Sequence, residues 1–325
     1  MRIDKSHFRG CLLGGATGDA KGYDVREGGK DLISDNTQMS VFTVDGMIWA
    51  DERAKRKGVY AYIPCLFYSY QKWYYTQTGN LADKDYGFIL GGEVMQRDEL
   101  FARRGKGVTS LNALGASIKN SYGSLKSRIN NSKACGCVMR VSPIGLYFAN
   151  DADRAFSIGC ESAALTHGHT EAIHSAGYMA ALISYLAQGA TLPDATEAAL
   201  GTLAASGDGD TVCADLIRKA ARLSKEKIST RKAIESIGEG YRAPEAIAIA
   251  TYLALVFGED FASATNAATD FNGNNDSIAP ICGNIIGMIA GCLEIPPKWV
   301  LDLELADLII HGADLLFDSV REHSV

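Results

Sequence analysis

The spacing of apolar and polar positions along this chain predicts helices rather than strands. Val41, Val44, Met47 and Ile48 recur at intervals of three, three and one residues, so they share one face of a helix. Long segments with the two-residue period of a strand, separated by turn signals, are absent from the sequence. We therefore expect an all-α protein.

A second apolar segment, residues 278–292, carries glycines at a regular helical spacing. Gly283, Gly287 and Gly291 follow one another every four residues, between apolar side chains. Glycines at this spacing share one face of a helix, and because they lack a Cβ atom they let a neighbouring backbone approach closely. We expect a central helix that is buried on all sides.

The C-terminal part of the chain has an amphipathic pattern that predicts one terminal helix. Asp302, Glu304 and Asp307 are expected on its more solvated side. The apolar positions of the opposite side are Leu301, Leu303, Leu305, Leu308, Ile309, Ala313 and Leu316.

Residues 97–133 have a different composition from the segments around them, with many Gly, Ser, Asn, Lys and Arg residues and only interrupted helical pieces. We expect a long surface excursion there. Long loops of compact domains are often functional.

Two polar clusters each precede one of these apolar segments. The first is Ser-Asp-Asn-Thr-Gln-Met at residues 34–39, and the second is Gly-Asn-Asn-Asp-Ser at residues 273–277. Ser, Asp and Asn are typical of helix N-termini, where their side chains cap free backbone N–H groups. Their oxygen atoms also suit Mg²⁺ or Ca²⁺ rather than zinc. The clusters are therefore either two halves of a split metal site or simple helix caps.

Composition limits the classes of function. The 325 residues, 47% hydrophobic and 22% charged, contain no evident linker, so we expect one domain over residues 1–325. A net charge of -6 argues against general nucleic-acid binding. No apolar run reaches the ~20 residues of a membrane span, and we expect a cytoplasmic protein without a membrane partner, monomeric by default. The eight cysteines lie mostly in apolar contexts and are expected to be reduced thiols.

Several blocks resemble, in order, the signatures of the ADP-ribosylglycohydrolase family, which includes the dinitrogenase reductase activating glycohydrolase and the ADP-ribosylarginine and ADP-ribosylserine hydrolases. The first block is Gly-Gly-Ala-Thr-Gly-Asp-Ala at residues 14–20, and the two polar clusters are the next signatures. Residues 130–140, 164–169 and 238–241 are similar to further blocks of the bacterial members. Several ordered blocks are a more specific signal than a single glycine motif.

The resemblance implies a compact orthogonal helical bundle that hydrolyses the N- or O-glycosidic bond between ADP-ribose and a target, with water as nucleophile. Asp35 and Asp276 are the implied catalytic carboxylates. One or two Mg²⁺ ions would be held by Ser34, Asp35, Asn36, Asn274, Asp276 and Ser277. ADP-ribose, free or on a modified protein, would lie beside Asp19, Gly136, Cys137, Val138, Met139 and His167. From the residues alone, His167 is equally explained by a helix end.

The sequence departs from the family pattern at several positions. Asn36 and Asn274 stand where the family usually has aspartate, and Cys137 where it has glycine. The usual glutamate falls at Arg26, although the adjacent Glu27 could serve after a one-residue shift. An amide oxygen can coordinate Mg²⁺, but the loss of two charges weakens the attraction for a divalent ion. Two hypotheses follow. The protein is an Mg²⁺-assisted ADP-ribosyl hydrolase, or it binds ADP-ribose or a modified protein without turnover.

Overall fold

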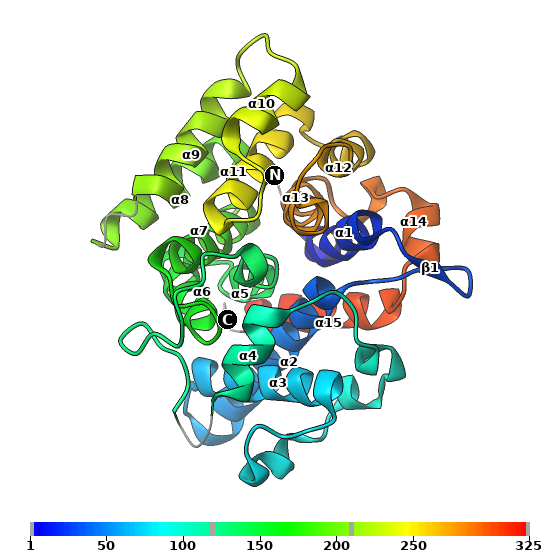
Figure 1. Cartoon of the computed structure of the whole chain (residues 1–325), viewed down its shortest axis with the longest axis vertical. Helices are drawn as coiled ribbons and strands as arrows, with labels where there is room; N and C mark the ends of the chain where they lie inside the picture. Colours follow the sequence, from blue (N-terminus) through cyan, green and yellow to red (C-terminus); the bar gives the residue numbers. More distant parts are fainter. Residues whose placement is uncertain (1–2, 118–120, 208–210, 323–325) are drawn as a thin grey trace.

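The computed structural model describes residues 3–117, 121–207 and 211–322, and it confirms the all-α fold (Figure 1). In these residues β-structure consists of a hairpin of β1 (Arg26–Glu27) and β2 (Lys30–Asp31), which pair antiparallel, and two isolated bridges. The α-helices are α1 (Lys5–Tyr23), α2 (Asp35–Lys57), α3 (Tyr62–Thr78), α4 (Val108–Gly115), α5 (Ser142–Tyr147), α6 (Ala152–Ala164), α7 (Thr170–Ala187), α8 (Leu192–Ala205), α9 (Thr211–Leu223), α10 (Thr230–Ile237), α11 (Ala243–Phe257), α12 (Phe261–Thr269), α13 (Asn275–Ala290), α14 (Pro297–Asp302) and α15 (Ala306–Glu322). Short 3-10 helices are η1 (Lys84–Ile89), η2 (Glu93–Gln96), η3 (Asp98–Phe101), η4 (Cys135–Cys137) and η5 (Cys292–Glu294).

Helices α1 and α13 lie side by side in the middle of the molecule (Figure 1). Their glycines face one another, because a Cβ atom added to Gly14 would overlap the carbonyl oxygen of Gly283, and one added to Gly10 would overlap that of Gly287. The two backbones are therefore in direct contact. Every residue of α13 from Ser277 to Met288 is buried, which confirms the prediction of a buried glycine-rich helix.

The buried contact between α1 and α13 brings the end of α1 and the start of α13, which are distant in sequence, close to the start of α2. Helix α2 packs against α3 and α15, and the aromatic side chains of Phe67, Tyr70 and Trp73 on α3 are buried in the core. The expected surface excursion after residue 97 contains η3 and α4. Within the described residues, no helix combines the length and the apolar character needed to cross a membrane.

The prediction of one continuous C-terminal helix was wrong. Helix α14 ends at Asp302 and α15 begins at Ala306. Between them Leu303 forms a bridge with Asp31, and Leu305 has a φ of 58°, which a helix does not allow. Pairing with β2 therefore interrupts the helix. Glu304, which was expected on the solvated side, is only 8% exposed.

Candidate functional site

The two polar clusters meet at the N-termini of α2 and α13. Ser34 caps α2, with its hydroxyl accepting a hydrogen bond from the Asn36 backbone N–H at 3.1 Å. Asn274 is the residue that precedes α13. The side-chain amide of Asn36 donates to the Asp276 carbonyl oxygen at 2.8 Å, although the two residues are 240 positions apart. Both clusters are helix N-termini, as predicted, and they share one site.

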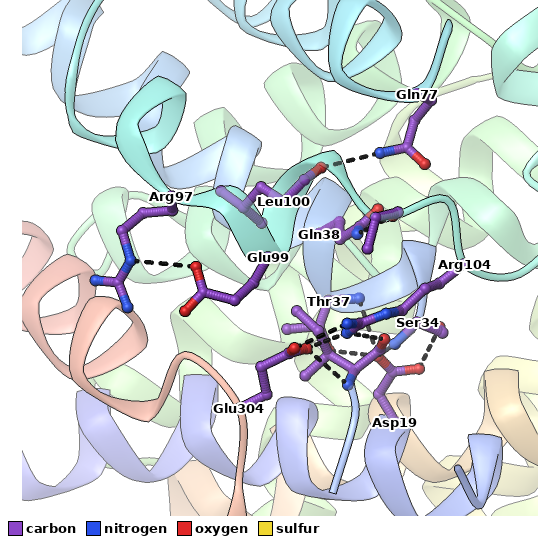
Figure 2. Close-up of polar contacts among 12 residues, drawn as sticks. Asp19, Ser34, Thr37, Gln38, Gln77, Arg97, Glu99, Leu100, Arg104 and Glu304 are labelled. Atoms are coloured by element: carbon purple, nitrogen blue, oxygen red, sulfur yellow. Dashed lines mark hydrogen bonds and ion pairs between the residues drawn. The ribbon is translucent and has the colours of Figure 1, made fainter. Parts of the chain in front are cut away.

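Asp19 of α1 lies beneath this junction and is fully buried (Figure 2). Its carboxylate accepts hydrogen bonds from the Ser34 hydroxyl at 2.5 Å and the Ser34 backbone N–H at 2.8 Å. It also accepts from the Thr37 hydroxyl at 2.6 Å and from the Asn36 amide at 3.3 Å. Burial raises the pKa of Asp19, and the Ser34 and Thr37 hydrogen bonds oppose that rise. Asp19 therefore ties α1 to the first turn of α2, and a contact of Asp19 with ADP-ribose stays a prediction.

Asp35 and Asp276 are the two other carboxylates of the site. Burial, followed by the nearby charge of Asp19 and then of Asp276, raises the pKa of Asp35 to about 7. Burial also raises the pKa of Asp276, against the opposing hydrogen bonds of its own backbone and of Ser277. Carboxylates of like charge that are partly removed from water destabilise one another's ionised forms. A bound cation would offset this repulsion.

The side-chain amide nitrogens of Asn36 and Asn274 are bound to protein acceptors. Both hydrogen bonds from the Asn274 side-chain amide go to protein acceptors, the Gly240 carbonyl oxygen at 3.0 Å and the Cys135 thiol at 3.1 Å. The Asn36 amide likewise donates to Asp19 and Asp276. An amide whose nitrogen is held in this way presents its oxygen on the opposite side.

The donor set at this junction fits a hard cation such as Mg²⁺. Among the described residues, no group of three His, Cys, Asp or Glu side chains could hold a metal ion. A metal here would therefore depend on amide and hydroxyl oxygens as well as on the carboxylates. The residues with side-chain oxygens at the starts of α2 and α13 are Ser34, Asp35, Asn36, Asn274, Asp276 and Ser277, and oxygen is the type of ligand that Mg²⁺ and Ca²⁺ prefer.

A loop that the sequence did not link to this site lies directly against Asp35. A Cβ atom added to Gly105 would lie 2.8 Å from the carboxyl carbon of Asp35, and the Gly107 backbone hydrogen-bonds to Asp35 and lowers its pKa. Both glycines have positive φ, 65° and 43°, which a residue with a side chain rarely adopts. The sequence pattern shows glycines in the surface excursion but does not indicate this contact.

Cys135, rather than Cys137, is the thiol at the site. The Cys135 sulfur accepts a hydrogen bond from Asn274, and burial, partly offset by a hydrogen bond with Ser277, raises the pKa of its thiol to about 11. Cys137 is fully buried and its sulfur lies 3.4 Å from the carbonyl oxygen of Ala172 in α7. Cys137 therefore occupies the core behind the loop.

His167 lies behind the same loop and is almost fully buried. The imidazole Nδ1 is 2.8 Å from the Thr166 hydroxyl, which accepts a hydrogen bond from the buried Arg140 at 2.7 Å. Burial and the Arg140 charge lower the pKa of His167 to about 3, so the ring is neutral. Its Nε2 faces Gly136 and has no hydrogen-bond partner among the described residues. His167 supports the loop from the rear.

The backbone of this loop is also held from outside by an ion-pair network. Glu171 at the start of α7 is paired with Lys133 at 2.9 Å and with Arg242. The Ala243 backbone N–H donates to the Lys133 carbonyl oxygen at 2.9 Å. Burial opposes the ionisation of Glu171, but the hydrogen bonds from Lys133 and Arg242 outweigh it and lower its pKa. The network joins the loop to α7 and α11.

We expect Glu171→Gln to lower the free energy of unfolding by about 1 kcal/mol at pH 7, because both partners of Glu171 are partly solvated. A carboxyl whose pKa is lower in the folded than in the unfolded state stabilises the protein above the unfolded-state pKa of about 4.3. The difference in the free energy of unfolding between wild type and variant should therefore be constant above about pH 5, and it should shrink as the pH falls below about 4. Urea unfolding across pH measures it, and a difference that grows at low pH would contradict the assignment.

A separate cavity of about 540 Å³ runs along another flank of α2, towards α15. It reaches Asn36 and Thr37 at one end and the aromatic rings of Trp49 and Phe88 at the other. Neither Asp35 nor Asp276 lines it. The cavity therefore adjoins the junction of the two clusters at Asn36, but the Asp35 and Asp276 carboxylates do not line it.

Comparison with known proteins agrees with this geometry. The sequence model of the ADP-ribosylglycohydrolase family matches residues 2–324. The chain belongs to the ADP-ribosylglycohydrolase family. A protein of Archaeoglobus fulgidus is 25% identical over 324 residues, which is 96% of this chain and 96% of the relative. A solved structure named ADP-ribosylglycohydrolase-related protein complex covers 97% of this chain and 98% of its own, with a TM-score of 0.64 and 20% identity. That structure shares the fold.

In this member of the ADP-ribosylglycohydrolase family, Arg26 lies on the β1–β2 hairpin. Its guanidinium forms ion pairs with Asp31 and Asp302, both at 2.8 Å. Glu27, the next residue, is exposed on the β1–β2 hairpin. Arg26 therefore fastens the hairpin to α14.

Proposed function

We propose that this protein is an Mg²⁺-assisted ADP-ribosylglycohydrolase that releases ADP-ribose from a modified target. The observation that carries the proposal is the junction of the two clusters, where Asn36 and Asp276 are joined across 240 residues. Asp35 and Asn36 stand in the first turn of α2 and Asp276 in the first turn of α13, directly after Asn274 and Asn275, and we propose that their side-chain oxygens face one shared site. Such a set of oxygen donors suits one or two Mg²⁺ ions.

Hydrolysis of an ADP-ribosyl bond passes through a transition state with oxocarbenium character and needs an oriented ribose and an activated water. A bound Mg²⁺ would lower the pKa of water and hold sugar hydroxyls. Asp35 or Asp276 would accept the proton of the attacking water. Both carboxylates lie in the first turn of a helix, α2 and α13 respectively. The backbone at Gly136 would lie along the ADP-ribose, with His167 supporting it from behind. Free ADP-ribose and ADP-ribosylated proteins are the proposed partners.

A second candidate is a family member that binds ADP-ribose without turnover. It is favoured by the hydrogen bonds of Asn36 and Asn274, because each amide nitrogen satisfies acceptors that an aspartate would repel. The site is thus adjusted to neutral side chains at two positions. Fewer charges around a divalent ion weaken its binding.

Calorimetric titration of ADP-ribose, with and without millimolar Mg²⁺, tests the proposal. We expect affinity for ADP-ribose to increase about tenfold with Mg²⁺, and the double variant Asn36→Asp, Asn274→Asp to bind Mg²⁺ about tenfold more tightly than the wild type because two charges are added. Binding that is independent of Mg²⁺ in the wild type would favour the second candidate. Absence of binding in both proteins would reject both candidates.

A further inference from the structure

Glu304 is a buried carboxylate far from the two clusters in sequence that lies next to the first of them in space. It follows Leu303, which pairs with Asp31, and its own backbone N–H donates to the Asp31 carbonyl oxygen at 3.1 Å. The side chain then reaches the backbone N–H of Ile33 at 3.4 Å. Ile33 immediately precedes the Ser34 cap of α2.

Arg104 completes this arrangement from the loop that covers Asp35 (Figure 2). Its guanidinium donates to both carboxylate oxygens of Glu304. Nη2 lies 2.9 Å from Oε1, and Nη1 donates to Oε2. The same guanidinium donates to the Ile33 carbonyl oxygen at 3.3 Å. Both backbone polar groups of Ile33 are therefore bound by one two-residue ion pair. Both side chains are largely buried, where such a pair is held in one geometry.

The backbone conformation next to Glu304 is costly. Leu305 has a φ of 58° and is not a glycine, a conformation that is unfavourable for an L-residue because its Cβ atom crowds the following carbonyl oxygen. Its side chain is buried. Strain of this kind persists only where the surroundings impose it, and it is often found at functional sites. Here it accompanies the turn that directs the Glu304 side chain towards Ile33 and Arg104.

The loop is fixed on the other side of Arg104 as well. The Gln38 side-chain amide donates to the Ala102 carbonyl oxygen at 2.9 Å, and Gln38 accepts a hydrogen bond from the Trp73 indole at 3.2 Å. Arg104 is followed directly by Gly105, whose backbone is pressed against Asp35. The position of Arg104 therefore determines how closely the loop approaches the carboxylate.

We propose that Glu304 is a positioning residue of the site: together with Arg104 it holds the Ile33 backbone and the 102–107 loop, and so sets the place of the Asp35 carboxylate. Glu304 touches neither a reacting atom nor a metal ligand side chain. It acts through Ile33 on one side of Asp35 and through Gly105 on the other. The consequence for Mg²⁺ binding rests on the proposed function, whereas the positioning itself does not.

Hydrogen exchange of the full-length protein without Mg²⁺ tests the positioning. In Glu304→Gln we expect backbone amides at residues 33–36 and 105–107 to exchange at least about tenfold faster than in the wild type, because hydrogen bonds to a charged group are stronger than those to a neutral one. Amides in the middle of α13 should be unchanged. The matched control is Glu322→Gln, which removes an exposed ion pair with Lys55 and should leave both segments as they are.

Arg104→Lys provides a second variant that keeps the charge and disturbs folding less. Lysine lacks the planar fork that binds Glu304 and Ile33 together, so the same two segments should again exchange faster. The exchanged pair Arg104→Glu, Glu304→Arg should restore part of the protection. Unchanged exchange in these segments for both single variants, or an equal increase throughout α1 and α13, would overturn the proposal.

Mg²⁺ affinity is the functional readout. Removal of a group that orients metal ligands typically costs 10- to 100-fold in metal affinity, and we expect a loss of about tenfold in Glu304→Gln. Local loosening without any change in Mg²⁺ affinity would show that Asp35 is positioned independently of Glu304 and would overturn the link to the site. A wild type that binds no Mg²⁺ would instead reject the proposed function, while the exchange result would still decide the role of Glu304.

Discussion

Gly283→Ala is expected to lower the free energy of unfolding by about 3 kcal/mol. The added Cβ atom would overlap the Gly14 carbonyl oxygen and lie 2.6 Å from the Gly14 carbonyl carbon. These atoms belong to the backbone of α1 and cannot rotate away, so the two helices must separate. The separation would also cost dispersion contacts along the whole interface. Urea unfolding followed by circular dichroism measures the change.

The matched control for this prediction is Gly201→Ala. Gly201 is also inside a helix, α8, but a Cβ atom added there meets no atom within 4 Å. Alanine should therefore stabilise the protein by about 0.5–1 kcal/mol, as expected for an exposed helical glycine. If Gly283→Ala lowers the free energy of unfolding by less than about 1 kcal/mol, α1 and α13 can move apart at little cost in stability.

Asp276→Asn is expected to lower the rate of ADP-ribose release about a thousandfold, if the protein is the hydrolase that we propose. The side chain keeps its size, but the site loses one of two carboxylates available to bind Mg²⁺ and to accept a proton. With amides already at positions 36 and 274, Asp35 would be the one remaining carboxylate among the proposed metal ligands. The assay measures release of ADP-ribose from modified arginine and serine substrates at saturating Mg²⁺.

Asp270→Asn is the control, because Asp270 is exposed at the end of α12, six residues before Asp276. It should leave the rate within twofold of the wild type, a difference of about 0.4 kcal/mol in the barrier. An Asp276→Asn rate within tenfold of the wild type would remove that carboxylate from the catalytic role. A wild type that turns over neither substrate at any Mg²⁺ concentration would instead support the binding-only candidate.

The sequence by itself was sufficient for the elements with a strong local signal. The spacing of Gly283 and Gly287 predicts a helix in contact with another backbone, and the structure confirms it. The polar clusters before two apolar segments predicted helix N-termini, since Ser, Asp and Asn are typical there. The Ser34 hydroxyl caps α2, whereas Asn274 occupies the N-cap position of α13 without a side-chain capping hydrogen bond. These features depend on residues within one or two helical turns.

Only the tertiary structure decided which distant groups surround the site. Glu304 has the pattern of a solvated helix residue, yet its segment pairs with Asp31 and buries its carboxylate against Arg104. Likewise, nothing local to Gly105 indicates that it lies against Asp35. Periodicity reports which face of a helix is apolar, but it cannot report a pairing between segments hundreds of residues apart. Such pairings are set by how whole helices pack, so they could only be found in the folded chain.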